Sequence, residues 1–177
     1  MPFKRSTRTY DEESLYEYAV AALGRQMRTV AEIKRLMRRR VGEQPHGDLL
    51  VEVVVARLKI HKYLNDTSYA ESYTRFRKEN EKFGRVRVIQ DLKAKGVHGD
   101  IIESTVGAAY DEVNEEQLAR EFLKRKRISK PADQKQAAKV FRTLVRAGFP
   151  SRIIFRILKT WNVDEETLTA LEEEGSG

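Results

Sequence analysis

The amino-acid sequence predicts an all-α protein made of three tandem three-helix repeats. Apolar residues recur at helical spacing along most of the chain. No proline lies between Pro45 and Pro131, which leaves that stretch free to form helices. A pattern of leucine, glycine and two isoleucines also returns after a fixed interval, as it does in repeat proteins. We therefore expect helices joined by tight turns in units of about 50 residues.

The first predicted repeat covers residues 12–64. Thr29 and Glu32 have the spacing of a capping box, which opens the second helix of this repeat. Gly42 lies where that helix ends, and Asp48 is the expected N-cap of the third helix.

The segment from Leu49 to Val55 is dense in β-branched residues and could form a buried strand. It occupies the third-helix position of its repeat, however, and the chain offers no second strand to pair with it. We therefore predict a helix there.

The second predicted repeat covers residues 65–114. Gly96 follows Lys95 at the position where a helix end needs a left-handed residue. Asp100 is the expected N-cap of the next helix, with Glu103 three residues further on. The apolar stripes of this repeat are Tyr69, Tyr73, Phe76 and Phe83, then Val88, Ile89 and Leu92, then Ile102, Val106, Ala109, Tyr110 and Val113.

The third predicted repeat covers residues 115–162. Five residues of the second repeat, namely Leu92, Gly96, Val97, Ile101 and Ile102, have counterparts 52 positions later in Leu144, Gly148, Phe149, Ile153 and Ile154. Ser151, which follows Pro150, is the expected N-cap of the last helix of this repeat.

Short segments flank the repeats: an N-terminal extension at residues 1–11 and an acidic C-terminal tail at residues 163–177. The tail holds six acidic residues and no basic one. We expect it to be a solvated terminal helix. In the alternative interpretation it mimics the charge of DNA and competes for the basic segments of the chain.

The charge of the chain indicates a polyanionic partner. Lys and Arg number 34 against 27 Asp and Glu, which leaves a net charge of +7 and a pI near 9.6. The charge is +5 over residues 1–65, −1 over residues 66–114 and +9 over residues 115–163. Two basic segments therefore flank a neutral centre. Composition alone leaves open whether the partner is a nucleic acid, an acidic protein face or anionic lipid.

Several classes of chemistry find no support in the sequence. The chain has no Cys, which excludes disulfides, thiolate zinc sites and thiol nucleophiles, and it has only three His. Glu43 and His46 have the spacing of a di-metal motif, but Pro45 lies between them and no second copy exists. The run Gly96–Gly99 lacks the Lys-Ser/Thr of a phosphate loop. We expect no cofactor, no metal and no enzymatic activity.

No segment approaches the roughly 20 consecutive apolar residues that span a bilayer. Together with the absence of Cys, this favours a reducing compartment and a cytoplasmic chain, with no membrane partner.

The order of motifs across the three repeats resembles the RecX family of bacterial recombination regulators. The matching residues of the central repeat are Tyr63-Leu64-Asn65-Asp66, Tyr69-Ala70, Arg77, Phe83-Gly84, Arg87-Val88, Asp91-Leu92 and Lys95-Gly96-Val97. Residues 28–33 and 141–149 resemble the patterns of the first and last repeats of the family. Three positions depart: Lys62 and Lys82 stand where the family shows glycine, and Asn65 stands where it shows aspartate.

The resemblance implies an elongated, curved array of three-helix repeats that lies in the helical groove of the RecA filament on single-stranded DNA. Such a protein restrains ATP hydrolysis and strand exchange by RecA and favours filament disassembly, without being an enzyme. A free-standing helical-repeat protein that acts directly on DNA is the alternative. Direct contact with DNA is left open, and we expect a monomer.

Twelve basic residues are the candidates for contact with the partner. Two dense runs form local positive patches, although such residues also complement a helix dipole. Five further cations lie in the neutral central repeat, where Arg77, Arg87 and Lys95 match family positions. The candidates are Arg38, Arg39, Arg40, Arg77, Arg85, Arg87, Lys93, Lys95, Lys124, Arg125, Lys126 and Arg127.

Each of these has a competing structural explanation. Arg87 has the four-residue spacing for an ion pair with Asp91. Lys95 is better explained as a helix-end residue that complements the dipole than as a contact. Aromatic residues could stack on bases, but most lie on the apolar stripes and are expected in the core. Tyr10 and Tyr16 are the aromatic residues whose place in the core is least certain from the sequence.

Overall fold

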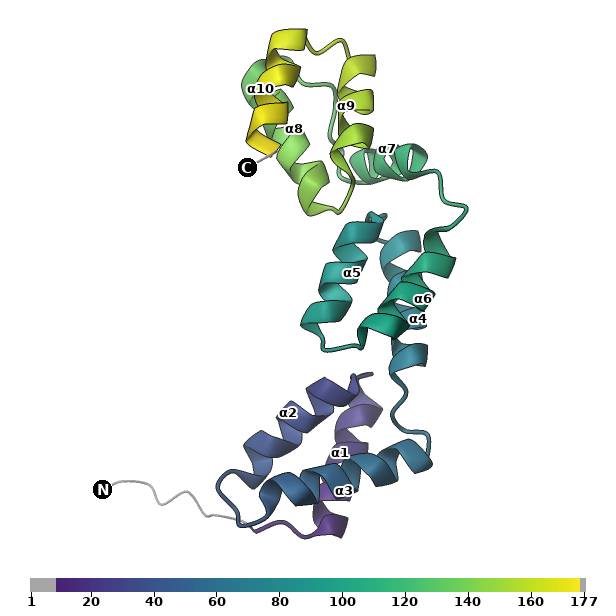
Figure 1. The fold of residues 1–177 in the computed structure, drawn as a ribbon, viewed down its shortest axis with the longest axis vertical. Coiled ribbons are helices and arrows are strands. Elements are labelled where there is room, and N and C mark those ends of the chain that lie inside the picture. Colours follow the sequence, from purple (N-terminus) through teal and green to yellow (C-terminus); the bar gives the residue numbers. More distant parts are fainter. Residues whose placement is uncertain (1–8, 176–177) are drawn as a thin grey trace, which may run out of the picture. The chain divides into compact units, whose positions relative to one another are not determined.

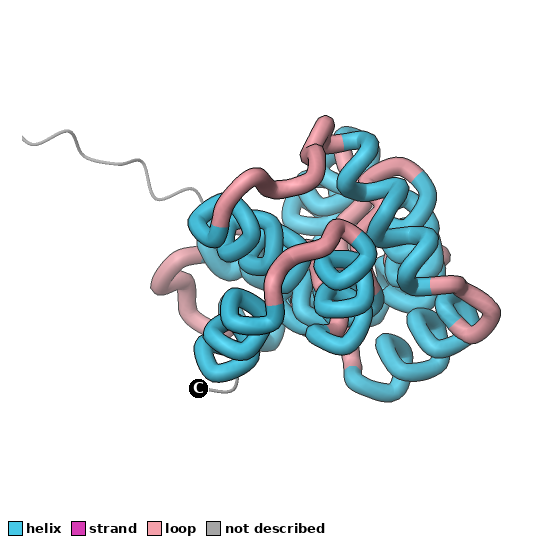
Figure 2. Tube along the Cα trace, turned by 90° about the horizontal axis from the view of Figure 1, so that it is seen from above, coloured by secondary structure: helices cyan, strands magenta, loops and turns pink. Residues whose placement is uncertain are grey.

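A computed structural model describes residues 9–175, and over that range the chain forms ten α-helices and no strand (Figures 1 and 2). This confirms the predicted all-α fold. The helices are α1 (Glu12–Arg25), α2 (Val30–Val41), α3 (Gly47–Ile60), α4 (Asp66–Glu79), α5 (Arg85–Ala94), α6 (Gly99–Tyr110), α7 (Glu115–Arg125), α8 (Gln134–Arg146), α9 (Ser151–Thr160) and α10 (Glu165–Gly175).

The β-branched segment from Leu49 to Val55 lies inside α3, as predicted. The described residues divide into two compact units, the first running to Tyr69 and including Ala94–His98, the second containing the rest. The division into three repeats at residues 64 and 114 therefore stays a prediction from the sequence pattern.

The first unit packs α1, α2 and α3 around one core. Leu15 and Ala19 of α1 are fully buried against Ile33 and Met37 of α2. The α3 helix contributes Val51, Val54, Val55 and Leu58 to the same core. One face of every helix is thus apolar, and burial of these side chains holds the unit together.

Hydrogen bonds at the helix ends fix where α1 and α2 begin. The predicted capping box is present: the Thr29 hydroxyl accepts from the Glu32 amide at 3.1 Å, and the Glu32 carboxylate accepts from the Thr29 amide at 3.0 Å. Asp11 and Ser14 form a second capping box at α1.

The prediction of Asp48 as an N-cap is wrong. His46 holds that position with a φ of 58° and no side-chain cap, so Asp48 falls in the first turn of α3.

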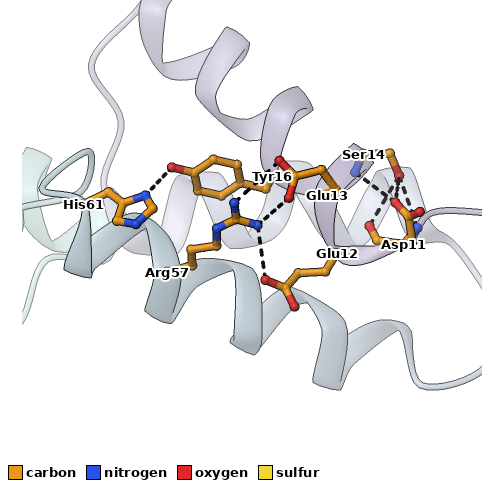
Figure 3. A network of polar contacts seen from close by, with 7 residues as sticks. All are labelled: Asp11, Glu12, Glu13, Ser14, Tyr16, Arg57 and His61. Atoms are coloured by element: carbon orange, nitrogen blue, oxygen red, sulfur yellow. Dashed lines mark hydrogen bonds and ion pairs between the residues drawn. The ribbon is translucent and has the colours of Figure 1, made fainter.

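A polar network joins α1 to α3 on the surface of this unit (Figure 3). The Arg57 guanidinium donates to Glu13 at 2.7 Å and to Glu12 at 3.2 Å, and it lies over the Tyr16 ring at 4.0 Å. The Tyr16 hydroxyl in turn contacts the His61 ring at 2.6 Å. Hydrogen bonds to Glu13 are the main reason that the pKa of Arg57 is raised. The Tyr16 side chain therefore has a structural role, linking α1 to α3.

Tyr10 also has a structural role, because its side chain is buried in the core of the first unit. The Tyr10 amide donates to the Gln44 side chain, and the Gln44 amide group donates back to the Tyr10 carbonyl, both at 2.7 Å. Gln44 thereby ties the segment before α1 to the loop between α2 and α3.

The second unit contains most of α4 and α5 and all of α6 to α10. The Phe122 ring lies near the rings of Phe83 and Phe149, at 6.1 and 6.0 Å between centroids. Leu144 and Ile154 are fully buried in the same unit. Aromatic and branched side chains therefore form its core.

Two predicted N-caps in this unit are wrong. Asp100 lies in the first turn of α6, which begins at Gly99, and Ser151 is the first residue of α9, where Pro150 holds the N-cap position. The tail prediction also needs correction, because Leu168 and Leu171 of α10 are buried and α10 packs against α8 and α9. The acidic helix is docked rather than simply solvated.

Glycine turns after α5 and α8 receive the beginnings of other helices. Gly96 (φ +77°) and Gly148 (φ +91°) have the predicted left-handed conformation. In the first unit, the Thr29 hydroxyl donates to the Lys95 carbonyl at 2.7 Å, beside Gly96. In the second unit, the Gly84 amide donates to the Ala147 carbonyl at 2.8 Å, beside Gly148. The first turn of one helix therefore satisfies terminal carbonyls of another.

Two lysines have a positive φ at the positions where the resemblance predicts glycine. Lys62 has a φ of 60° and Lys82 a φ of 59°. A positive φ is strained for a residue with a side chain, so both turns carry backbone strain. Asn65 keeps the capping role of aspartate, since its side chain accepts from the Ser68 amide at 3.0 Å.

Candidate partner-binding surface

The arginine run at the end of α2 divides into three different environments. Arg38 donates to Asp48 at 2.9 Å and lies 3.5 Å from Glu52. Arg40 lies over the rings of Tyr18 and Tyr10, at 4.8 and 5.7 Å from their centroids. Within the described residues, Arg39 is exposed and has no ion pair or hydrogen bond from its side chain. Of the three predicted contacts, Arg39 is thus the most available to a partner.

Lys95 is engaged inside the first unit. Its ammonium lies 3.1 Å from the Glu32 carboxylate and 5.8 Å from the centre of the Tyr69 ring. Burial alone would lower the Lys95 pKa, but hydrogen bonds with Tyr69 and Glu32 outweigh it and the pKa is raised. Lys95 therefore joins the capping box of α2 to the turn after α5, instead of only complementing a helix dipole.

Arg77 and Arg87 converge on the carboxylate of Asp91. The Arg87 Nε donates to Asp91 at 2.9 Å, which is the predicted four-residue pair, and the Arg77 Nε lies 3.9 Å from the same side chain. The Tyr73 hydroxyl donates to Asp91 at 3.0 Å, and burial raises the pKa of Tyr73. Both guanidinium groups also lie within 6 Å of the Phe83 ring. Asp91 is the centre of a structural cluster.

The run at the end of α7 is partly neutralised. Arg125 makes two contacts of 3.2 Å with the Glu81 carboxylate, and Lys126 lies 5.9 Å from the centre of the Phe122 ring. Lys124 and Arg127 are exposed, and the described residues provide neither with an ion pair. Arg85 and Lys93 of α5 are in the same situation. Five of the twelve candidates, Arg39 included, thus remain available cations.

A basic stripe on α8 is the feature that the sequence analysis missed. Lys135, Lys139, Arg142 and Arg146 follow each other at spacings of four, three and four residues, so they lie on one side of the helix. All four are exposed, and α8 contains no acidic residue. At about 1.5 Å per residue the stripe is roughly 16 Å long. The net charge of +9 over residues 115–163 does not show how its basic residues are arranged. Their spacing of three and four residues is the signal in the sequence that predicts a stripe on one side of a helix.

Other kinds of site find no support in the part of the chain that the structure describes. No group of three or more His, Asp or Glu residues there could hold a metal ion. Glu43 and His46 flank a loop whose Gln44 is used structurally. Among residues 9–175, no helix is both long enough and apolar enough to cross a bilayer.

Known proteins resemble this chain in sequence and in fold. A family model described as the second three-helix domain of RecX matches residues 65–106. Regulatory protein RecX of Deinococcus radiodurans is 33% identical over 162 residues, which cover 89% of this chain and 73% of that protein. Regulatory protein RecX of Bacillus velezensis is 30% identical over 168 residues, which cover 92% of this chain and 62% of that protein. The chain therefore spans less than two thirds of the Bacillus velezensis relative.

Two solved structures share the fold. One is a crystal structure of regulatory protein RecX, with a TM-score of 0.67, 23% identity and coverage of 84% of this chain and 71% of that one. The other is a crystal structure of RecX from Lactobacillus salivarius, with a TM-score of 0.65, 22% identity and coverage of 85% and 96%. Both support an array of helical repeats.

Proposed function

Because the chain belongs to the RecX family of regulatory proteins, we propose that it binds the RecA filament on single-stranded DNA in its helical groove. Binding there inhibits ATP hydrolysis, strand exchange and recombination by RecA and favours filament disassembly. The protein acts by binding, in the cytoplasm, and no catalytic group takes part. The observation that carries the proposal is the similarity to a RecX protein along 89% of the chain.

The available cations supply the physical means of binding. A filament on DNA is a polyanion, and exposed Lys and Arg attract it over a distance that salt shortens. The α8 stripe carries Lys135, Lys139 and Arg146 as exposed cations on a helix without acidic residues, whereas Arg142 of the same stripe already interacts with another group of the chain. By contrast, Arg38, Arg87 and Arg125 are held by carboxylates of this chain. We therefore assign the main electrostatic contact to the α8 stripe, with Arg39, Arg85, Lys93, Lys124 and Arg127 as further contacts.

The α8 stripe also favours the second candidate function, in which the protein acts directly on DNA. A row of cations along one side of a helix can contact successive phosphates without reading the sequence. Such binding would not require RecA.

One experiment separates the two functions. Hydrolysis of ATP by RecA on single-stranded DNA is measured while this protein is titrated, and binding to naked single-stranded DNA is measured in parallel by fluorescence anisotropy. Inhibition at concentrations well below those that coat naked DNA supports the first function. Inhibition that only follows coating of the DNA supports the second, and no inhibition at any concentration contradicts the first.

A charge-reversed pair tests the role of the stripe. Lys135→Glu with Lys139→Glu should raise the concentration for half inhibition roughly tenfold or more, because each change replaces an attraction by a repulsion. The control is Arg25→Glu with Arg75→Glu, two exposed cations outside the proposed contacts that change the net charge equally. If both pairs of substitutions raised the concentration for half inhibition equally, the stripe would contribute only through the net charge of the protein.

A further inference from the structure

The outer face of α3 carries an exposed apolar ridge. Leu49 is 66% exposed, Val53 48% and Ile60 76%, and Ala56 is exposed between them. These four residues, which we call the α3 ridge, are spaced by four, three and four positions and so form one stripe. The opposite face of α3 is the core face with Val51, Val54 and Leu58. The β-branched density of this segment thus reflects a helix that is apolar on two faces.

Ion pairs border the ridge on both sides. Glu52 contacts Lys34 at 2.7 Å and Arg38 at 3.5 Å, which ties α3 to α2. On the other side, Arg57 holds Glu12 and Glu13 of α1. An apolar strip with a polar rim has the anatomy of a protein–protein interface. Among the described residues, 9–175, the large side chains of the ridge thus stay about half exposed or more.

We propose that the α3 ridge binds the α3 ridge of a second copy of this chain, with the two helices antiparallel. A two-fold axis between Val53 and Ala56 places Leu49 opposite Ile60 of the second copy and Val53 opposite Ala56. At the centre Val53 then packs against the smaller Ala56, and at each end Leu49 packs against Ile60. A contact of this kind is self-complementary, as a two-fold interface must be.

Charge complementarity supports this orientation. Glu52 and Lys59 lie on the same flank of the ridge, seven residues apart, and the two-fold axis brings Lys59 of one copy close to Glu52 of the other, where it would join Lys34 and Arg38 around that carboxylate. Lys59 is exposed, and the described residues give it no ion pair of its own. In a parallel pair Ala56 would face Ala56 and leave a gap, and Lys59 would meet no acidic side chain. The antiparallel pair also aligns the helix dipoles favourably.

The size of the ridge sets the expected affinity. The eleven steps from Leu49 to Ile60, at about 1.5 Å each, give a contact of roughly 16 Å along the helix axis. An interface of this length falls at the low end for specific complexes, below about 1,200 Å². We therefore expect a weak, reversible dimer that replaces the predicted monomer at high concentration.

Sedimentation equilibrium of the full chain over a wide concentration range tests the proposal. The wild type should rise from the monomer mass of 20.5 kDa toward twice that value as concentration increases. Val53→Glu and Ile60→Glu should each stay at the monomer mass, because they place a charge in the ridge. Val145→Glu, at a 45% exposed valine of α8, is the matched control and should associate like the wild type. Circular dichroism confirms that each variant is folded.

A charge reversal tests the orientation. Lys59→Glu should weaken association several-fold, because it places carboxylates opposite each other, and adding Glu52→Gln should relieve that repulsion without setting a new cation beside Lys34 and Arg38. A wild type that is monomeric at every concentration overturns the proposal, as does a dimer that Val53→Glu leaves unchanged. A monomeric wild type whose inhibition of RecA is lost in Val53→Glu would assign the ridge to the filament instead. The proposal does not depend on the proposed function, because the measurement contains neither RecA nor DNA.

Discussion

The glycine turn after α8 provides the sharpest test of the fold, through the substitution Gly148→Ala. A methyl group on Gly148 would overlap the backbone nitrogen of Arg87, which cannot move as the end of a side chain can. The matched control is Gly42→Ala, because Gly42 also has a positive φ of 56° but has open space on that side. Both alanines would have a positive φ, which costs about 1–2 kcal/mol in the left-handed region and up to about 3 kcal/mol at Gly42, whose ψ of −128° lies outside that region.

Only Gly148→Ala should lose the contact with α5. Relief of the overlap moves the turn away from the first residues of α5, and it breaks the bonds from the Gly84 amide to Ala147 at 2.8 Å and from the Val86 amide to Gly148 at 3.3 Å. Each bond contributes about 0.5–1.5 kcal/mol net, so Gly148→Ala should destabilise the protein by about 2–5 kcal/mol. Gly42→Ala should cost about 1–3 kcal/mol, from its backbone conformation alone.

Urea unfolding and amide hydrogen exchange together measure this difference. The free energy of unfolding gives the total loss, and exchange at the Gly84 and Val86 amides reports the two bonds directly. Faster exchange at both amides in Gly148→Ala, and unchanged exchange in Gly42→Ala, is expected. Equal losses of stability in the two variants, with both amides still protected from exchange, would contradict the proposed overlap between a methyl group on Gly148 and the backbone of Arg87.

Three further predictions concern the helix ends and the acid sensitivity of the chain. Lys62→Gly should raise the free energy of unfolding by up to about 1 kcal/mol, since it relieves a left-handed lysine at a φ of 60°, and thermal unfolding checks this. Thr29→Ala should cost about 1–3 kcal/mol in urea, because the buried hydroxyl both donates to Lys95 and accepts from Glu32; a loss below that of an exposed cap would contradict it. Hydrogen bonds from Arg120 and Arg156 hold the pKa of Glu116 below the ordinary value of 4.5, so its contribution to stability is present above pH 4.5 and disappears as the pH falls through the lowered pKa. Unfolding in urea between pH 6 and pH 3 should show this loss, and it should shrink in Glu116→Gln.

The helices and several of their ends could be predicted because the deciding interactions are local. The Thr29 capping box involves residues three apart, and Gly96 and Gly148 follow directly on the helices that they end. The caps that failed show the limit of this reasoning. At Asp48 the left-handed residue His46 starts the helix early, so the aspartate falls inside the first turn. A cap depends on the backbone conformation before the helix, which residue type alone does not reveal.

Partner contacts were harder to predict than helices, because the fold decides which cations are already used. The pair of Arg87 with Asp91 is four residues apart and could be foreseen. Arg125 finds Glu81 across 44 residues, and Lys95 finds Glu32 across 63. No sequence pattern shows such pairs. A count of basic residues therefore overstates the available charge, and it also hid the α8 stripe, which lies in no dense run of cations.

The three glycine turns show why one sequence motif serves two purposes. At Gly96 and Gly148 the glycine is needed both for its positive φ and because another helix begins against it; a methyl group on Gly96 would come within 2.5 Å of the Ala31 side chain. At Gly42 only the backbone conformation requires glycine, since no atom of the described residues lies within 4 Å of an added methyl group. The glycines that recur after 52 residues, Gly96 and Gly148, therefore do more than end a helix. They mark the positions where the beginning of one helix donates hydrogen bonds to the end of another, and the diverged first copy is the one without such a contact.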